Sequence, residues 1–328
     1  MLLKSGFVSI IGRPNAGKST LMNALVGEKV AIVTAKPQTT RTRIHGVLEV
    51  AAAKGKHPAA QIIFVDMPGV HKPGTSLDRR MMQEVHDALE TRDAVLLIVD
   101  ATRRLDLPEP DAPTTGRESE DAFVFELLRK LDCPVFLLLN KIDRVERAKL
   151  LPLIAQLSSL YDFAEVIPIS ALKRDGLDRL LAKLIDVLPK GERYFPKDQF
   201  TDQPERFLAA ELIRERILME TGEEVPYASA VVVERFEEPQ PGARSPLTRI
   251  SAVIYCERAG QKAILIGKGG SKLKAIGTGA RKEIESLVGT RVFLELHVIV
   301  KENWRESRGF VESLDWRRQI EDLGTKGS

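Results

Sequence analysis

Short, nearly continuous apolar runs alternate with amphipathic segments through the first half of the chain. Runs of this length predict buried strands, and the amphipathic segments have the spacing of helices that cover a sheet. The predicted strands are Phe7–Ile11, Gln61–Asp66, Ala94–Asp100, Pro134–Asn140 and Glu165–Ile169. The predicted helices are Ser19–Leu25, Leu77–Glu90, Ala122–Leu131, Ala148–Leu160 and Leu177–Leu188. Residues 1–188 are therefore expected to form an α/β domain with a mostly parallel sheet.

The alternation stops after Leu188. Residues 189–204 (PKGERYFPKDQFTDQP) combine prolines with mixed charge and predict a linker. Residues 205–304 predict a small α+β domain, and residues 305–328 a charged tail with one helix, Gly309–Asp322. The elements expected in the small domain are a helix (Glu205–Glu220), two strands (Val225–Glu237 and Thr248–Glu257), an apolar segment ending at Gly267, a helix (Ser271–Leu287) and a strand (Arg291–Val300).

Two further stretches interrupt the pattern. Ala51–Ala60 is small and polar and indicates a hairpin-like insert, whereas Arg103–Asp121 is rich in proline and charge and indicates an exposed loop. We interpret both as surface insertions.

The composition is that of an ordinary globular protein. Of the 328 residues, 49 are Lys or Arg and 46 are Asp or Glu, giving a net charge of +3. This balance excludes a uniformly basic surface but not a local basic patch. Two cysteines, Cys133 and Cys256, cannot build a disulfide framework and indicate a reducing, cytoplasmic compartment. No apolar stretch approaches the roughly 20 residues that span a bilayer, and the N-terminus does not resemble a signal peptide.

A phosphate-binding loop follows the first predicted strand. The segment from Gly12 to Ser19 matches G-x-x-x-x-G-K-[ST] and lies between a strand and a helix, which is the context that the motif requires. Lys18 is expected to contact the β- and γ-phosphates, and the Ser19 hydroxyl is expected to ligate Mg²⁺. The residues predicted to form this loop are Gly12, Arg13, Pro14, Asn15, Ala16, Gly17, Lys18, Ser19 and Thr20.

A second motif predicts guanine as the base. Asn140-Lys141-Ile142-Asp143 ends a strand, and Asp143 can accept two hydrogen bonds from guanine that adenine cannot donate. Asn140 is expected to tie this loop to the phosphate loop, and the Lys141 stem is expected to cover the purine. After the next strand come Ser170 and Ala171, whose amide could donate to the guanine O6.

Asp66-Met67-Pro68-Gly69 ends the second predicted strand. Asp66 is expected to hold Mg²⁺ through water, and the Gly69 amide is expected to sense the γ-phosphate. Met67 and Pro68 between them are also predicted to belong to the nucleotide-binding residues. A threonine of Gln38-Thr39-Thr40-Arg41 could complete the Mg²⁺ shell in the GTP state, and Thr40 is favoured over Thr39.

The catalytic group is the least determined part of the site. The position after Gly69 is Val70, which cannot orient water as a glutamine does. One hypothesis is that Asn15 ligates K⁺ against the phosphates, and the alternative is that Asn15 only shapes the loop. The predicted catalytic residues are Lys18, Asn15, Thr40 and Gly69.

The second domain carries a predicted RNA-binding turn. Ile264-Leu-Ile-Gly267-Lys268-Gly269-Gly270 joins an apolar segment to a helix, which is the layout of a KH domain. The stretch Arg258–Lys282 carries basic residues and no acidic ones, so the small net charge conceals a basic patch. The residues predicted to contact RNA are Gly267, Lys268, Gly269, Gly270, Lys272 and Lys274.

In this order and spacing, from about Phe7 to Trp304, these motifs resemble the Era family of bacterial GTPases. This family belongs to the TrmE-Era-EngA-like class of P-loop GTPases and has a C-terminal type II KH domain. The family usually has threonine where this chain has Met67. The resemblance implies binding near the 3′ end of small-subunit (16S) ribosomal RNA, a role in small-subunit assembly, and partial peripheral association with the cytoplasmic membrane.

We therefore expect a monomeric, cytoplasmic GTPase switch that uses GTP, Mg²⁺ and, under the Asn15 hypothesis, K⁺. Two other readings stay open. The chain could be an RNA-binding assembly module in which GTP is mainly a structural ligand, or a membrane-surface signalling GTPase. The sequence shows no lipidation motif in support of the latter.

Overall fold

The computed structural model describes residues 3–34, 36, 38–55, 57–69, 74–105, 119–222, 224–242 and 244–319. The chain forms two compact units, each with its own core. The N-terminal unit comprises Met1–Ala31, Thr40–Pro73 and Met81–Asp202, and the C-terminal unit comprises Ile32–Thr39, Gly74–Arg80 and Gln203–Ser328.

A six-stranded sheet in the order β2-β3-β1-β4-β5-β6 forms the centre of the N-terminal unit. Neighbouring strands are parallel except for β2, which pairs antiparallel with β3 at one edge. The five predicted strands are present, and β2 is an element that the sequence analysis did not predict. The strands are β1 (Lys4–Ile11), β2 (Ile44–Val50), β3 (Ala60–Asp66), β4 (Ala94–Asp100), β5 (Val135–Asn140) and β6 (Glu165–Pro168).

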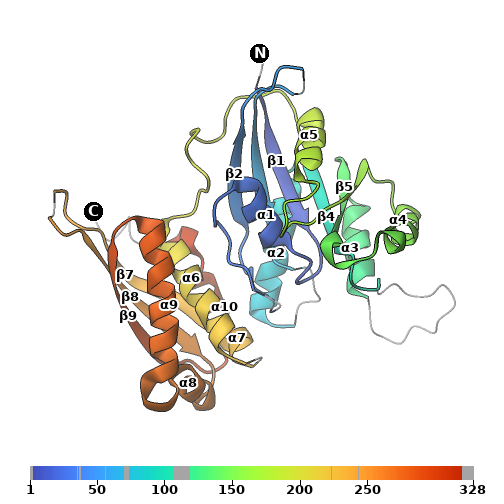
Figure 1. Ribbon diagram of the computed structural model, residues 1–328. Coiled ribbons are helices and arrows are strands. Elements are labelled where there is room, and N and C mark those ends of the chain that lie inside the picture. The colour runs from blue at the N-terminus through green and yellow to red at the C-terminus, as the bar shows by residue number, and fades with distance from the viewer. Residues whose placement is uncertain are drawn as a thin grey trace, which may run out of the picture. The chain divides into compact units, whose positions relative to one another are not determined.

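Helices cover both faces of this sheet (Figure 1). One apolar cluster joins the sheet to α1 (Lys18–Val26) and α5 (Leu177–Val187). The other joins it to α2 (Ser76–Glu90), α3 (Glu120–Leu128) and α4 (Leu150–Ser158). Because successive side chains of a strand point to opposite faces, a buried parallel strand supplies both clusters, and this explains the continuous apolar runs. Two short 3₁₀ turns, η1 (Ile142–Arg144) and η2 (Arg147–Lys149), follow β5.

Most of the predicted linker is bound to the N-terminal unit. We call residues 189–202 the strap. The amide of Gln61, a fully buried residue of β3, accepts hydrogen bonds from the Tyr194 and Phe195 N–H groups at 2.8 and 3.0 Å. Further along, the Phe200 carbonyl accepts the Val47 N–H at 2.9 Å. These bonds explain how a proline-containing polar segment can be ordered without an apolar pattern.

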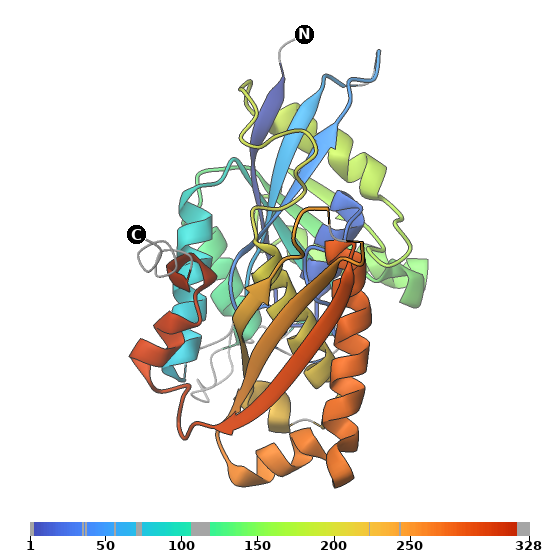
Figure 2. The same ribbon diagram turned by 90° about the vertical axis from the view of Figure 1, so that its left-hand side faces the viewer.

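The C-terminal unit is built on a three-stranded sheet in the order β7-β8-β9, which Figure 2 shows with its strands side by side. β7 (Ala230–Glu237) and β8 (Leu247–Cys256) are antiparallel, whereas β8 and β9 (Arg291–Val300) are parallel. One apolar cluster joins this sheet to its helices. The helices of the unit are α6 (Glu205–Glu220), α7 (Glu224–Ala228), α8 (Ala259–Ile266), α9 (Ser271–Val288) and α10 (Arg308–Ser313), with the 3₁₀ turn η3 (Lys268–Gly270) before α9.

Several predicted boundaries differ from the structure. The strand predicted from Val225 begins only at Ala230, because the preceding residues form α7, and the apolar segment before Gly267 is the helix α8. The predicted tail helix is interrupted after Ser313, where α10 ends. The hairpin-like insert has an antiparallel bridge between Ala53 and His57. Of the predicted loop 103–121, residues 106–118 lie outside the described residues.

Candidate nucleotide site and RNA-binding turn

The phosphate loop is shaped at its end by a glycine that no other residue could replace. Gly17 precedes α1 with a left-handed φ of 105°. A Cβ atom at this position would lie 2.3 Å from Asn140 Nδ2. The positive φ and the lack of space for a Cβ atom both require glycine. The close approach of Gly17 to Asn140 places the N-terminus of α1, with its N–H groups, next to the base-binding loop.

Lys18 is buried and folds back over the loop. Its ammonium donates to the carbonyl oxygens of Gly12 and Arg13, both at 3.0 Å. Burial lowers the pKa of Lys18 from its ordinary value to about 8, although nearby Asp66 opposes this effect. A phosphate group would supply the negative charge that this buried ammonium lacks.

Asp66, Ser19 and Thr40 form a compact cluster of oxygen atoms. Asp66 Oδ2 accepts the Ser19 hydroxyl at 2.6 Å and the Thr40 hydroxyl at 3.2 Å, and the two hydroxyl oxygens lie 3.0 Å apart. Burial raises the pKa of Asp66, which is fully buried. Asp66 Oδ1 is also buried and has no hydrogen-bond partner among the described residues. An all-oxygen donor set with an unsatisfied carboxylate oxygen fits Mg²⁺.

The structure distinguishes the two candidate threonines. The Thr40 hydroxyl lies against Ser19 and Asp66, as described above. The Thr39 hydroxyl instead bonds the Lys36 carbonyl at 2.6 Å and the Thr34 hydroxyl at 2.8 Å. This geometry favours Thr40 as the metal ligand.

In the base-binding loop, Asn140 connects three segments. This residue ends β5 and is 2% exposed. Its Nδ2 donates to the Ala16 carbonyl of the phosphate loop at 2.8 Å. Its Oδ1 accepts the Ala171 N–H at 3.0 Å, and this is the amide that we expect to lie near the guanine O6. A buried N–H group needs an acceptor, and Asn140 supplies one.

Asp143 and Ser170 also contact each other, and the Ser170 hydroxyl donates to Asp143 Oδ1 at 2.6 Å. Asp143 belongs to η1, which directly follows Lys141. Lys141 itself has a left-handed φ of 66°. The Ser170 hydroxyl uses one lone pair of Oδ1, and a carboxylate has further lone pairs that can accept hydrogen bonds from a base.

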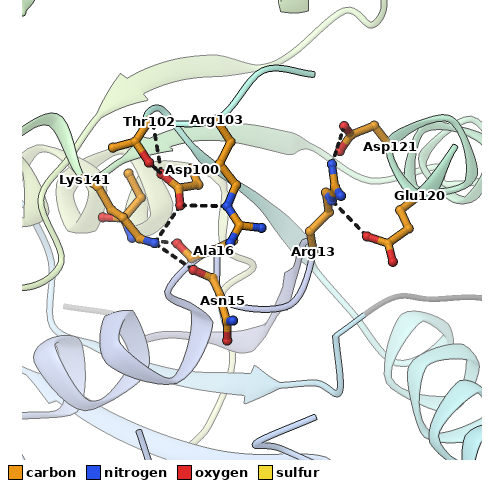
Figure 3. A network of polar contacts seen from close by, with 10 residues as sticks. Arg13, Asn15, Ala16, Asp100, Thr102, Arg103, Glu120, Asp121 and Lys141 are labelled. Atoms are coloured by element: carbon orange, nitrogen blue, oxygen red, sulfur yellow. Dashed lines mark hydrogen bonds and ion pairs between the residues drawn. The ribbon is translucent and has the colours of Figure 1, made fainter. Parts of the chain in front are cut away.

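The Lys141 ammonium does not lie free in the site. Figure 3 shows it between Asp100 at the end of β4 and the backbone of Asn15. It donates to Asp100 Oδ2 at 2.6 Å and to the Asn15 carbonyl at 2.8 Å. The sequence analysis did not single out Asp100. The sequence feature that could have indicated Asp100 is a carboxylate at the end of an otherwise apolar predicted strand, Ala94–Asp100.

The Arg13 side chain does not take part in the contacts between Lys141, Asp100 and Asn15. Its guanidinium forms ion pairs with Glu120 and Asp121 at the start of α3, both at 3.0 Å (Figure 3). This arrangement leaves the backbone of Arg13 as its contribution to the phosphate loop.

The segment after Asp66 is placed against the phosphate loop. A Cβ atom on Gly69 would lie 2.8 Å from Pro14 Cγ, so Gly69 packs on that loop. The Met67 side chain is fully buried in the apolar cluster that includes α2 to α4 and cannot contact a nucleotide. Pro68 lies between them, and Thr20 belongs to α1. Val70 lies outside the described residues.

The predicted RNA-binding turn lies between α8 and α9. Gly267, Gly269 and Gly270 all have left-handed φ values, of 70°, 59° and 79°. A Cβ atom on Gly269 or Gly270 would meet nothing within 4 Å, so the turn is open on its outer side. Lys268 and Lys274 are exposed, and Lys272 lies 3.7 Å from Glu220. The Ile264 side chain, 45% exposed, adds an apolar surface beside the turn.

The first unit and its site define a P-loop GTPase domain, and the second unit has the element order and glycine turn of a KH domain. Comparison with protein families agrees: residues 7–141 match the family described as 50S ribosome-binding GTPase, and residues 224–305 match the KH domain family. The chain is 43% identical over 317 residues to GTPase Era of Ruminiclostridium cellulolyticum, covering 97% of this chain and 99% of that protein. GTPase Era of Syntrophus aciditrophicus is 47% identical over 304 residues, or 93% of this chain and 92% of that protein. The chain belongs to the Era family of GTPases, which are enzymes that hydrolyse GTP to GDP and phosphate.

Two solved structures are similar over nearly the full length. A single-residue variant of Aquifex aeolicus Era bound to GDP·AlF4⁻ has a TM-score of 0.84 and 38% identity, covering 94% of this chain and 98% of that one. Era in complex with MgGDPNP and nucleotides 1506–1542 of 16S ribosomal RNA has a TM-score of 0.83 and 39% identity, with the same coverage. None of the helices that the structure describes has the length and hydropathy needed to cross a membrane.

Proposed function

We propose that this chain is a GTPase switch that binds 16S ribosomal RNA through the turn between α8 and α9 and assists assembly of the small ribosomal subunit. The observation that carries the proposal is the joint presence, in one chain, of a guanine nucleotide site and an open, basic glycine turn. The relative solved with MgGDPNP and nucleotides 1506–1542 of 16S ribosomal RNA supports this proposal over 94% of the chain. The match to the family described as 50S ribosome-binding GTPase covers residues 7–141 alone, whereas the Era complex with 16S ribosomal RNA matches 94% of this chain.

At the metal position, Ser19 and Thr40 would supply hydroxyl ligands to Mg²⁺, and Asp66 would hold the ion through water. The ion would neutralise charge that develops on the phosphates during transfer. Lys18 would add a second positive charge, since phosphate would favour its protonated form. With Thr40 bound only in the GTP state, the segment before it would change with the nucleotide.

Binding of RNA is tested with the oligonucleotide of 16S nucleotides 1506–1542. Changing Lys268, Lys272 and Lys274 together to alanine should weaken binding, and should reduce the slope of log affinity against log salt by about 2. A matched triple variant of exposed lysines in the N-terminal unit, at Lys54, Lys130 and Lys149, should bind normally. Equal affinity of the two triple variants would refute the proposed RNA surface.

The switch is tested by comparing this RNA affinity in the presence of a GTP analogue and of GDP. A switch requires different affinities in the two states, because a ligand shifts an equilibrium only by its differential affinity. Equal affinities would favour the alternative in which GTP is mainly a structural ligand of an RNA-binding module.

We further propose that Asn15 ligates K⁺ in the reaction, as the sequence analysis suggested. Asn15 has a left-handed φ of 64° and lies in the phosphate loop, where a cation could contact the phosphates. Turnover should be faster in K⁺ than in Na⁺ for the wild type and equal in both for Asn15→Ala. Equal wild-type rates in the two salts would instead leave Asn15 as a loop-shaping residue.

We also propose that the protein is a cytoplasmic monomer, with the compartment inferred from its two cysteines. A peripheral membrane fraction is proposed from the family resemblance alone. Sedimentation with vesicles of anionic lipid, compared with neutral lipid, tests the membrane fraction. Absence of the protein from both pellets would contradict it.

A further inference from the structure

Asp100 occupies a position level with the base-binding loop. It is the last residue of β4 and pairs in register with Asn140, the last residue of β5. The carboxyl ends of adjacent parallel strands form the edge where ligands bind in open α/β sheets. Asp100 therefore lies beside the base-binding loop although it is 40 residues earlier in the chain than Asn140.

The Asp100 carboxylate is fixed independently of Lys141. Its Oδ1 accepts the Thr102 N–H at 3.0 Å and the Thr102 hydroxyl at 2.7 Å, and its side chain is 7% exposed. Burial by itself would raise the pKa of Asp100, but the hydrogen bonds from Lys141 and Thr102 lower it below its ordinary value. Asp100 thus presents a charged, oriented oxygen to Lys141.

The ammonium of Lys141 is consequently held at a defined point. It lies 2.6 Å from Asp100 Oδ2 and 2.8 Å from the Asn15 carbonyl (Figure 3). A lysine side chain that is free to rotate loses rotamer entropy when it is ordered. Here Asp100 and the Asn15 carbonyl order the side chain within the protein, so less of this entropy is left to lose when a base binds.

We propose that Asp100 is a positioning residue for guanine nucleotide binding, which acts by holding the Lys141 ammonium between itself and the phosphate loop. The proposal rests on the proposed role of Lys141 as the residue that covers the purine. Asp100 would not touch the nucleotide.

A double-mutant cycle on the full chain tests the proposal. The variants are Asp100→Asn, Lys141→Met and the double variant, and the probe is fluorescently labelled GDP followed by equilibrium titration and stopped-flow dissociation. We expect Asp100→Asn to weaken GDP about tenfold, mainly through faster dissociation, and to change affinity less than about twofold when Lys141 is already methionine. GTP turnover by Asp100→Asn should show a raised KM with kcat within about twofold of the wild type.

Arg103→Gln provides the matched control. Arg103 lies 3.7 Å from the same carboxylate with a side chain 54% exposed, so its loss should leave GDP affinity unchanged. An Asp100→Asn affinity equal to that of the wild type would overturn the proposal. An equal loss in both Lys141 backgrounds would also overturn it, because Asp100 would then act on the fold and not through Lys141. If Lys141→Met alone binds GDP normally, the role assigned to Lys141 fails instead.

Discussion

Removing the Asn140 side chain should destabilise the N-terminal unit by leaving two buried backbone groups without partners. The Ala16 carbonyl would lose its donor at 2.8 Å, and the Ala171 N–H would lose its acceptor at 3.0 Å. Ala16 and Ala171 are each only 2% exposed. An unsatisfied buried group costs about 1–3 kcal/mol, so Asn140→Ala should cost about 3 kcal/mol if water reaches part of the space. That is roughly a hundredfold change in the folding equilibrium.

Urea denaturation can detect this change in the unit where it occurs. Both tryptophans, Trp304 and Trp316, belong to the C-terminal unit, so their fluorescence reports that unit, whereas far-UV circular dichroism reports both units. We expect the circular dichroism midpoint of Asn140→Ala to fall by about 1 M urea. Labelled GDP should also dissociate faster, because the phosphate loop and base-binding loop would no longer be joined.

Glu146→Ala is the control for a substitution near the same loop. Glu146 has a side chain 76% exposed and pairs only loosely with Lys149, so its loss should change the unfolding free energy by less than about 0.5 kcal/mol. If Asn140→Ala is as stable as this control and releases GDP at the wild-type rate, the two hydrogen bonds do not hold the loops together and the reasoning is wrong.

Substitutions of Gly17, Trp304 and Asp100 test three further features of the structure. Gly17→Ala should abolish GDP binding in a fluorescence titration, because its Cβ would lie 2.3 Å from Asn140 Nδ2 at a φ of 105°; tight binding would contradict this steric argument. Trp304→Phe should lower the stability of the C-terminal unit by about 1–3 kcal/mol in urea, since the fully buried indole donates to the Ala228 carbonyl at 2.8 Å, and an unchanged midpoint would show that this bond contributes little. Because the pKa of Asp100 is lowered in the folded state, its stabilisation should be complete above about pH 5 and lost as the pH falls through the folded-state pKa. The difference in unfolding free energy between the wild type and Asp100→Asn should accordingly be constant from about pH 5 to 8 and shrink below about pH 4, and a difference that grows on acidification would refute the assigned direction.

The elements that the sequence predicted well are those with strong local patterns. Central strands such as Ala94–Asp100 are buried on both faces and therefore read as unbroken apolar runs. The edge strand β2 (IHGVLEV) contains polar residues and a glycine, and a pattern of this kind does not distinguish a strand from a loop. The strap was predicted as a linker because its order depends on a buried amide from a distant strand, at Gln61, which no local pattern shows.

The same distinction holds for the candidate site. The motifs placed Asp66 and Asn140 at the ends of strands and Lys18 at the start of the helix after the phosphate loop, because each motif is a local sequence in a local structure. The partners of these groups could not be predicted in the same way. Whether the Ala171 amide bonds Asn140 or a base, and which acid receives the Lys141 ammonium, depends on distances between segments far apart in the chain.

The strap also determines where this protein can be divided. A shortened chain that ends at residue 188 would remove the two N–H donors to the buried Gln61 Oε1. It would also uncover the Phe7 ring, whose centroid lies 4.8 Å from that of Tyr194 in an edge-on contact. Such a fragment would present an unpaired polar group and an aromatic surface to other molecules, and low yield or aggregation would say nothing about the GTPase fold itself. An isolated nucleotide-binding fragment should extend to Asp202, whose carboxylate contacts His45 at 2.7 Å.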